Sequence, residues 1–518
     1  MTAAQGVRLA PLVRFAEAAA LARDAPAVSD ERRTVSYVEL TRLAAAVADD
    51  VARAAPADAA VLVCTERSVD FVIAIVGVAA AGCVYVPIDP TEPAPRLAHI
   101  VASSGAALAV VDAAGRETMR GAGLHLLDVG RKREARTPAL PLRAGARGAY
   151  TLFTSGSTGR PKGVAITIAN LASFLAGARA WTRLTPRETW SCFHSFTFDV
   201  AMWEIWGSLV SRGHLVILPR AAQLDPELLR SILEERAVMR LCQTPTALRQ
   251  LVAAIGPRRR PPWLRSLYVA GERLDFEVLA PLADDVRNFG LEAANMYGPT
   301  ETTIYATGHQ ISETEIHAER RSLIGRALPH VTVAVNRDDG SACVQGETGE
   351  IWIGGDGVAA GYLGADDAAA AAFVETPRGR FFRTGDVGRV DDANVLEFLG
   401  RSGGFVKIRG YRVEPREVAY ALCQHPAVVD AAVVDVAGLP GGQALVAGVV
   451  VRPGPAVSET AIRRFAAGVL PTHMLPARLM IVESLPTLPS GKLDLETARE
   501  QLTALATRRL PRRAGDAG

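Results

Sequence analysis

The sequence has few cysteines and no cluster of metal-binding side chains. Its six cysteines are scattered along 518 residues without a Cys-x-x-Cys pair, and its nine histidines show no metal-ligand spacing. A disulfide framework and a zinc site are therefore excluded, because both need cysteine or histidine at close, regular spacing. The composition predicts reduced thiols and a cytoplasmic protein.

Net charge is also nearly absent. The formal net charge is +2, from 57 basic and 55 acidic side chains. A field this weak argues against nucleic-acid or membrane partners. The arginines at 258–260 and within 508–513 are interpreted as a solvated loop and tail. No signal peptide is visible, because Arg14, Glu17 and Arg23 interrupt the first apolar stretch.

One uncharged run, from Phe71 to Val86, has the composition of a membrane span. It is short for a span, and Gly77, Gly82 and Pro87 interrupt it. The pattern instead predicts a buried helix over 69–81 that ends at Gly82, followed by a strand over 84–86.

The segment from Thr154 to Gly163 is rich in small polar residues and lies between two apolar runs. It holds four hydroxyl side chains, three glycines and Lys162. Glycines bring backbone N–H groups close to an anion, and hydroxyls and a lysine add donors and charge. We predict a phosphate-binding loop joining strands at 149–153 and 164–168. It lacks the P-loop spacing, and a Ser/Gly-rich surface turn is the alternative reading.

This loop and a series of later motifs, in the same order, resemble the adenylate-forming enzymes. That family includes the adenylation domains of nonribosomal peptide synthetases, acyl-CoA and aryl-CoA ligases, and luciferases. The resemblance covers about residues 13 to 500. The later motifs are Tyr297-Gly-Pro-Thr-Glu301, Gly349-Glu-Ile-Trp-Ile-Gly with Gly361-Tyr-Leu, Arg383-Thr-Gly-Asp386, Gly400-Arg401, Val406-Lys-Ile-Arg-Gly-Tyr-Arg-Val-Glu-Pro415, Leu470-Pro-Thr-His-Met-Leu-Pro476 and Leu488-Pro-Ser-Gly-Lys492.

The expected fold is α/β, with a large N-terminal domain over 1–402 that holds the ATP and amino-acid sites. Alternating helix and strand patterns predict layered α/β subdomains, and short strands at 331–335 and 349–353 predict a small barrel-like sheet. The glycine-rich segment at 400–404 marks a joint. A small mobile α+β domain over 403–518 is expected to follow.

The resemblance assigns the phosphate end of ATP to the loop, Thr300 and Glu301. The loop and Lys162 hold the β- and γ-phosphates, Thr300 bonds the α-phosphate, and Glu301 binds Mg²⁺ beside phosphate oxygens. The loop residues implied are Thr154, Ser155, Gly156, Ser157, Thr158 and Gly159.

The nucleoside end of ATP is assigned to four other side chains. By resemblance, Asn295 and Tyr297 meet the adenine through an amide hydrogen bond and stacking. Asp386 accepts hydrogen bonds from both ribose hydroxyls, and Arg401 also reaches the ribose.

Two lysines are implied to serve two half-reactions. Lys492 reaches the substrate carboxylate and the α-phosphate during adenylation, and Lys407 faces the site for thioester formation after the small domain rotates. The family usually has Asp or Lys at the pivot of that rotation. Gly403 stands there in this sequence, so the pivot is free to move but neither state is restrained.

The segment starting at Phe198 resembles the one that opens the substrate pocket in amino-acid-activating members, where Asp199 pairs with the α-ammonium. Since the pocket carries no free cation and no second anion, a small to medium neutral amino acid is expected, Ser/Thr-like ahead of small aliphatic. The implied pocket residues are Asp199, Val200, Trp203, Cys242, Tyr268, Ala270, Met296, Ile304, Tyr305 and Lys492.

The sequence is therefore interpreted as a free-standing ATP-dependent ligase that loads the phosphopantetheine thiol of a separate carrier protein. A small adenylation-helper protein is a further possible partner. Two alternatives stay open: an acyl- or aryl-CoA ligase, against which Asp199 argues, and a non-catalytic homologue that binds an acid or a nucleotide.

Overall fold

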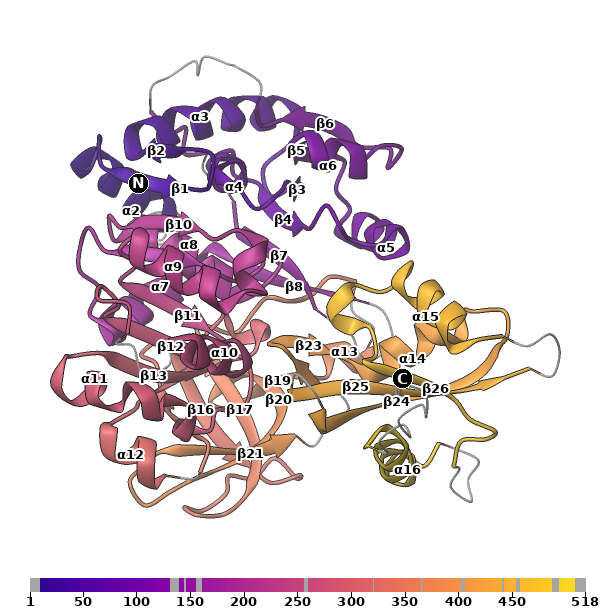
Figure 1. Ribbon diagram of the computed structural model, residues 1–518. Helices are drawn as coiled ribbons and strands as arrows, with labels where there is room; N and C mark the ends of the chain where they lie inside the picture. Colours follow the sequence, from indigo (N-terminus) through magenta and orange to yellow (C-terminus); the bar gives the residue numbers. More distant parts are fainter. Residues whose placement is uncertain are drawn as a thin grey trace, which may run out of the picture. The chain divides into compact units, whose positions relative to one another are not determined.

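The computed structural model describes residues 10–130, 139–143, 146–154, 161–255, 260–319, 321–364, 367–401, 406–439, 442–452, 457–486 and 493–507 (Figure 1). By their contacts these residues form two compact units, one running to Arg401 and the other starting at Val406. Residues 93–96 and Pro161 group with the second unit. The predicted boundary at 402/403 lies outside the described residues. The predicted class, a large layered α/β domain followed by a smaller one, is confirmed.

The first unit contains a sheet of seven described strands in the order β18-β8-β7-β4-β3-β5-β6, mostly parallel in its centre. Figure 1 shows α3 and α6 beside these strands. Its strands are β3 (Ala60–Cys64), β4 (Val84–Ile88), β5 (Leu108–Val111), β6 (His125–Asp128), β7 (Gly148–Thr154), β8 (Lys162–Thr167) and β18 (Gly361–Tyr362), and the helices along this part of the chain are α2 (Ala10–Leu21), α3 (Tyr37–Ala54), α4 (Val69–Ala80), α5 (Ala94–Ser104) and α6 (Ala113–Thr118).

The uncharged run beginning at Phe71 is a core helix followed by a strand, as predicted. Nearly every residue of α4 is buried, and Gly82 adopts a φ of 71° just after its end. That left-handed conformation suits glycine and terminates the helix. Among the described residues, no helix has the length and apolar character to cross a membrane.

Strands flank the predicted phosphate loop on both sides, as expected. β7 and β8 pair antiparallel, with Thr154 opposite Lys162. The loop residues 155–160 lie outside the described part of the chain.

The second sheet of the first unit contains fourteen described strands, ordered β16-β17-β20-β21-β15-β14-β13-β12-β11-β9-β10-β1-β2, with β19 paired to β20. The short strands that we predicted at 331–335 and 349–353 are present as β16 and β17. They extend the large sheet, because β15 pairs antiparallel with both β14 and β21. These strands are β1 (Pro26–Ser29), β2 (Thr34–Ser36), β9 (Thr189–Cys192), β10 (His214–Ile217), β11 (Arg240–Gln243), β12 (Ser266–Ala270), β13 (Glu292–Tyr297), β14 (Thr307–Gln310), β15 (Leu323–Ala327), β16 (Val331–Asn336), β17 (Gly349–Gly355), β19 (Phe373–Thr376), β20 (Gly379–Val390) and β21 (Leu396–Arg401).

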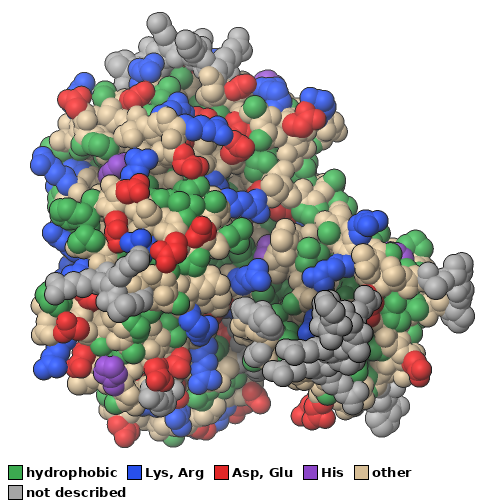
Figure 2. Space-filling view, viewed as in Figure 1, with side chains coloured by type: hydrophobic (Ala, Val, Ile, Leu, Met, Phe, Trp, Pro, Cys, Tyr) green, Lys and Arg blue, Asp and Glu red, His purple; other side chains and the backbone are tan. Residues whose placement is uncertain are grey.

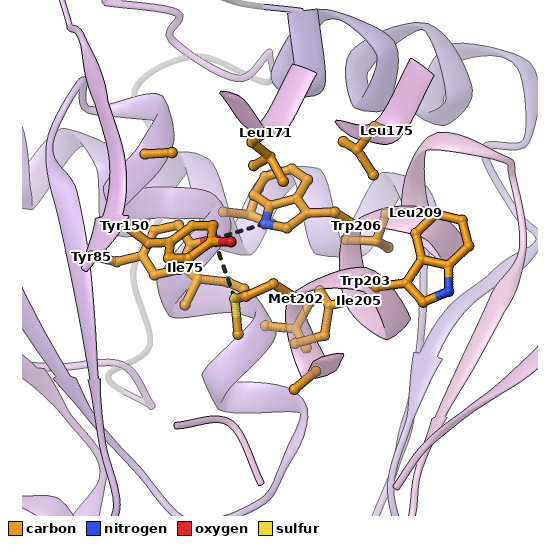
Figure 3. Close-up of a cluster of buried hydrophobic side chains, with 14 of the residues drawn as sticks. Ile75, Tyr85, Tyr150, Leu171, Leu175, Met202, Trp203, Ile205, Trp206 and Leu209 are labelled. Carbon is orange, nitrogen blue, oxygen red and sulfur yellow. Dashed lines mark hydrogen bonds between the residues drawn. The ribbon is translucent and has the colours of Figure 1, made fainter. Parts of the chain in front are cut away.

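The two sheets of the first unit share one hydrophobic core, through which helix α8 (Asp199–Val210) runs with all its residues buried. In Figure 3 the Tyr85 hydroxyl lies between two α8 side chains: it accepts a hydrogen bond from Trp206 (2.8 Å) and donates one to the sulfur of Met202 (3.4 Å). The contact ties α8 to the first sheet. The other helices of this unit are α7 (Ile168–Thr182), α9 (Pro226–Glu235), α10 (Pro245–Ile255), α11 (Ala283–Asn288), α12 (Glu313–Ala318) and α13 (Asp367–Ala370).

The second unit has two small sheets and its own apolar core. β24 and β25 pair antiparallel and β26 joins β25 in parallel, while β22 and β23 form a separate hairpin. Its elements are β22 (Val406–Ile408), β23 (Tyr411–Val413), α14 (Pro415–Cys423), β24 (Val428–Leu439), β25 (Gly442–Val451), α15 (Glu459–Ala467), β26 (Arg478–Ile481) and α16 (Leu495–Thr507).

Acidic and basic side chains are interspersed over the face seen in Figure 2. This mixture fits the formal net charge of +2. Among the described residues on that face, no single sign of charge accumulates that would attract a polyanion.

Candidate active site

Three parallel strands place four of the predicted pocket residues on one face of the large sheet. Cys242 on β11 lies opposite Tyr268 on β12, and Ala270 lies opposite Met296 on β13. Tyr268 and Ala270 are two residues apart, so their side chains share a face. The register therefore brings together residues that are far apart in the sequence.

Aromatic contacts surround this face. Phe174 of α7 packs edge-on against Trp203 of α8 (ring centroids 5.6 Å apart) and against Tyr305 (6.2 Å). Val200, one turn before Trp203, and Ile304, next to Tyr305, belong to the same buried cluster. Burial raises the pKa of the Cys242 thiol and of the Tyr305 phenol, so both are neutral near pH 7.

The chain is strained where it passes from the Tyr297-Gly-Pro-Thr-Glu motif to Tyr305. Thr303 and Ile304 both have left-handed φ values, 62° and 73°, which a β-branched residue rarely adopts. A Cβ at Gly298 would lie 2.3 Å from the Ile304 carbonyl oxygen, so only glycine fits there. Thr303 is held by a 2.7 Å hydrogen bond to the Gly357 carbonyl.

Asp199 and Thr300, which sequence reasoning assigned to different substrates, are hydrogen-bonded. The Thr300 hydroxyl donates to Oδ2 of Asp199 at 2.7 Å. Asp199 lies in the first turn of α8 with 7% of its surface exposed, where the helix dipole favours a carboxylate. The residue predicted for the α-ammonium thus lies beside the residue predicted for the α-phosphate.

Glu301 is fully buried and accepts a 2.6 Å hydrogen bond from the hydroxyl of Tyr362. The Lys162 ammonium lies 5.6 Å from the centre of the Tyr362 ring, in the range of a cation–π contact. Tyr362 is on β18, paired with β8 just after Lys162. The structure therefore links the lysine of the loop to the predicted magnesium ligand.

The predicted ribose and adenine residues also meet. The Tyr297 hydroxyl donates a 2.6 Å hydrogen bond to Oδ2 of Asp386, which is fully buried. The amide nitrogen of Asn295 donates to the Leu323 carbonyl at 2.8 Å. Arg401 pairs opposite Asp386 through the backbone, and its side chain lies outside the described part.

The sequence did not predict the hydrogen bonds and ring contact that hold the chain just before α8. Glu204 is fully buried and accepts hydrogen bonds from the backbone N–H groups of Phe193 and His194, both 3.2 Å long. The His194 ring contacts the same carboxylate at 3.1 Å and stacks on Phe198, just before Asp199. A glutamate and a histidine ten positions apart gave no recognisable motif.

A second missed group is a buried ion pair beside Tyr268. Arg240 of β11 bonds Glu188 through Nε (2.5 Å) and Nη2 (3.2 Å), and its Nη1 donates to the Tyr268 hydroxyl. The two charged side chains are 4% and 6% exposed. Burial raises the pKa of Tyr268 to about 12 although Arg240 opposes the shift, so the phenol stays neutral.

Several predicted residues cannot be placed. Ser155, Gly156, Ser157, Thr158, Gly159, Gly403 and Lys492 lie outside the described residues. Thr154 ends β7. Lys407 lies half-buried on β22 in the second unit. Among the described residues, no group of three His, Cys, Asp or Glu side chains could hold a metal ion.

Comparison with known proteins identifies the family. The AMP-binding enzyme family matches residues 15–363, and its C-terminal domain matches residues 417–492. The chain belongs to the AMP-binding enzyme family. Its relatives include the syringomycin synthase SyrB1 of Pseudomonas syringae pv. syringae, 32% identical over 90% of this chain and 78% of that protein. Another is a dimodular nonribosomal peptide synthase of Bacillus subtilis, 33% identical over 93% of this chain.

This chain spans only 21% of the length of the Bacillus synthase. Among solved structures, holo-PA1221, a protein with adenylation and PCP domains, superimposes with a TM-score of 0.81 at 28% identity, over 94% of this chain and 83% of that one. The Vibrio cholerae adenylation domain AlmE has a TM-score of 0.83 over 95% and 98% of the two chains, but at 21% identity it shows the fold alone.

The chain is thus an adenylation domain of the nonribosomal peptide synthetase type, an ATP-dependent adenylating ligase. Adenylate-forming enzymes use ATP and Mg²⁺.

Proposed function

We propose that this adenylation domain activates a small to medium neutral α-amino acid and transfers it to the phosphopantetheine thiol of a separate carrier protein. The observation that carries the proposal is the Asp199–Thr300 hydrogen bond. When Asp199 binds the α-ammonium, the carboxylate of the substrate lies next to Thr300, the residue assigned to the α-phosphate.

In the first half-reaction, an oxygen of the substrate carboxylate forms a bond to the α-phosphorus of ATP. The bond from that phosphorus to the bridging oxygen breaks, and pyrophosphate leaves. Such a displacement needs positioning and charge neutralisation more than a side-chain nucleophile. Asp199 orients the amino acid through its ammonium. Thr300 has one hydroxyl hydrogen, which then turns from Asp199 to the α-phosphate.

The phosphate side of the reaction is assigned to the loop, Lys162, Glu301 and Lys492. A single buried carboxylate with phosphate oxygens is a usual environment for Mg²⁺, and Glu301 with its Tyr362 bond fits that environment. When bound, the ion neutralises phosphate charge. Lys162 sits where the loop ends, and Lys492, in the Pro-Ser-Gly-Lys motif, is proposed to reach the reacting carboxylate.

Asp386 and Tyr297 are proposed to hold the nucleoside. The Tyr297 hydroxyl orients the buried carboxylate of Asp386. The Thr384 hydroxyl accepts from the backbone N–H of Asp386 at 2.9 Å and holds the chain there. Arg401 is assigned to the ribose, and the amide oxygen of Asn295 to the adenine amino group.

The side-chain pocket is assigned to Val200, Trp203, Cys242, Tyr268, Ala270, Met296, Ile304 and Tyr305. Their side chains are apolar or carry neutral thiol and phenol groups. A charged substrate side chain would lose its hydration there without a partner, which costs several kcal/mol. Neutral side chains of Ser/Thr or small aliphatic type therefore fit best.

In the second half-reaction, the carrier thiol attacks the aminoacyl carbonyl and AMP leaves. We assign Lys407 to this step, after rotation of the residues from 403 onwards about Gly403. A helper protein is a further proposed partner.

The acceptor distinguishes this proposal from an acyl- or aryl-CoA ligase. Purified protein is given ATP, Mg²⁺ and a radiolabelled amino acid, with either free CoA or phosphopantetheine-loaded carrier domains. Label on a carrier domain but not on CoA supports the proposal. Efficient transfer of the label to CoA, or a faster formation of CoA thioesters when fatty or aryl acids replace the amino acid, would contradict it.

A further inference from the structure

The buried pair Arg240–Glu188 lies directly beside the proposed amino-acid pocket. Arg240 and Cys242 are two residues apart on β11 and therefore share a face. Cys242 is opposite Tyr268, and the Tyr268 hydroxyl accepts a hydrogen bond from Nη1 of Arg240. The guanidinium also lies 5.4 Å from the centre of the Trp190 ring, which packs 5.1 Å from Trp203.

The pair is fully satisfied in the interior. Glu188 receives two bonds from Arg240 and a third, 2.7 Å long, from the Thr185 hydroxyl. Nη2 of Arg240 also donates to the Thr182 carbonyl at 3.3 Å. Every donor nitrogen of the guanidinium therefore has an acceptor. Of these acceptors, Tyr268 is the proposed pocket residue.

Such a pair is not explained by stability alone. Removing two charges from water costs several kcal/mol per ion, and apolar residues of similar volume are often equally stabilising. In the interior, water does not screen an unpaired charge, so such a charge would act strongly on the side chain of a bound substrate. A pair placed against a pocket wall therefore has consequences for what the pocket accepts.

We infer that Arg240 and Glu188 determine the side-chain specificity of this adenylation domain. Arg240 fixes the ring of Tyr268, one of the proposed pocket residues, and so limits the length of the substrate side chain. Glu188 neutralises Arg240, so that no unpaired positive charge beside Tyr268 attracts acidic substrate side chains. This inference rests on the proposed function, because it concerns the pocket for the amino acid. Both are positioning residues, since they act through Tyr268 and through the local field.

The sharpest test is Glu188→Gln, which keeps the shape of the side chain and removes its charge. Amino-acid-dependent ATP–pyrophosphate exchange is measured for aspartate, glutamate and the neutral amino acid that the wild type prefers. The kcat/KM for the acidic substrates relative to the neutral one should rise roughly tenfold or more, the scale at which one pocket contact discriminates. A purely structural role would lower all rates without changing this ratio.

Tyr268→Phe tests the positioning of the ring, because it removes the acceptor of Nη1 of Arg240 and keeps both charges of the ion pair. It should reduce discrimination between neutral amino acids that differ by one methylene, and it keeps the inference testable if Glu188→Gln fails to fold. Asp285→Asn is the matched control, because Asp285 bonds Arg260 at 2.7 Å in a similarly shielded pair outside the pocket residues. Its specificity ratios should equal those of the wild type.

The outcomes separate the two claims. Normal exchange by the wild type, with both ratios unchanged in Glu188→Gln and Tyr268→Phe, would overturn this inference and leave the proposed function standing. If the wild type shows no exchange with any amino acid, the proposed function fails and this inference fails with it.

Discussion

The hydroxyl of Thr300 donates a 2.7 Å hydrogen bond to the carboxylate of Asp199. The two residues are 101 positions apart and belong to different motifs, one at the start of α8 and one in a 3₁₀ turn, Thr300–Thr302. Their contact joins the proposed site for the ammonium to that for the α-phosphate. An α-amino acid carries its ammonium and its carboxylate on one carbon atom, so neighbouring sites for the ammonium and the α-phosphate suit it.

Replacing Asp199 should remove amino-acid activation. In Asp199→Asn the shape is kept, but the substrate ammonium would be buried without an anion, which destabilises the bound state by about 3–5 kcal/mol. Exchange with the preferred amino acid should fall at least 100-fold. Glu227→Gln, an exposed carboxylate in the first turn of α9, should have no effect. Wild-type exchange rates for Asp199→Asn would remove Asp199 from the site.

Glu301 and Tyr362 should control the magnesium requirement. Tyr362→Phe deletes the hydroxyl that bonds Glu301 at 2.6 Å, so the carboxylate is less well oriented. A titration of exchange activity against free Mg²⁺ should shift to higher concentration, roughly tenfold, the lower end for losing an outer partner of a metal ligand. Glu301→Gln should shift it further, and EDTA should abolish activity in all variants.

The KM for the amino acid should change much less than the Mg²⁺ dependence in Tyr362→Phe. Equal changes in both would mean that the substitution disturbs the whole site, and would contradict the prediction. Phe382→Leu, a substitution of another buried ring, on strand β20 of the other sheet, serves as the packing control. It should leave the Mg²⁺ titration unchanged.

Much of this site could be predicted because it follows from local motifs. The strands on either side of the phosphate loop and the helix over 69–80 follow from apolar runs and punctuating glycines. The site residues at the ends of β12 and β13 follow from the resemblance to the family. The Arg240–Glu188 pair could not be predicted. Its partners are 52 positions apart, and only the order of strands β11 and β9 brings them together. For the same reason the continuation of the large sheet through β15 was missed, since short polar-edged strands do not reveal their neighbours.

The two lysines should separate the half-reactions. Lys492→Ala should lower adenylation on the order of 10²–10³-fold, the scale for losing one preorganised donor to a developing charge. Lys407→Ala should spare pyrophosphate exchange and slow transfer from preformed aminoacyl-adenylate to the carrier thiol. Gly403→Pro, which fixes φ, should impair one half-reaction more than the other.

Single-turnover assays of each half-reaction measure these effects. Equal losses in both steps for both lysine variants would show that alternation between two states does not organise the enzyme. Lys492→Arg keeps the charge and serves as the conservative comparison.

Stability should fall in mild acid because of His330. Burial lowers the pKa of His330 to about 4 from 6.5, although nearby Asp356 opposes the shift. The unfolded chain therefore binds a proton below pH 6.5 that the folded chain does not bind until about pH 4. Neutral, buried His330 therefore contributes at most about 3 kcal/mol to the free energy of unfolding. This contribution is complete above pH 6.5 and is lost as the pH falls to 4.

Chemical denaturation of the wild type and of His330→Leu at several pH values between 7 and 4 measures this dependence. The variant should lose less stability over that interval, whereas His125→Leu, an exposed histidine on β6, should behave as the wild type. Identical pH profiles for all three proteins would contradict the assignment.

The central claim is that this adenylation domain recognises the α-ammonium of its substrate through Asp199. Amino-acid-dependent ATP–pyrophosphate exchange with matched pairs of acids tests it most directly: threonine against 3-hydroxybutyrate, and valine against 3-methylbutanoate. Each pair differs only in the α-amino group. We predict exchange with one or more amino acids of this size and none above background with their des-amino partners. Equal or faster exchange with the des-amino acids would contradict the account.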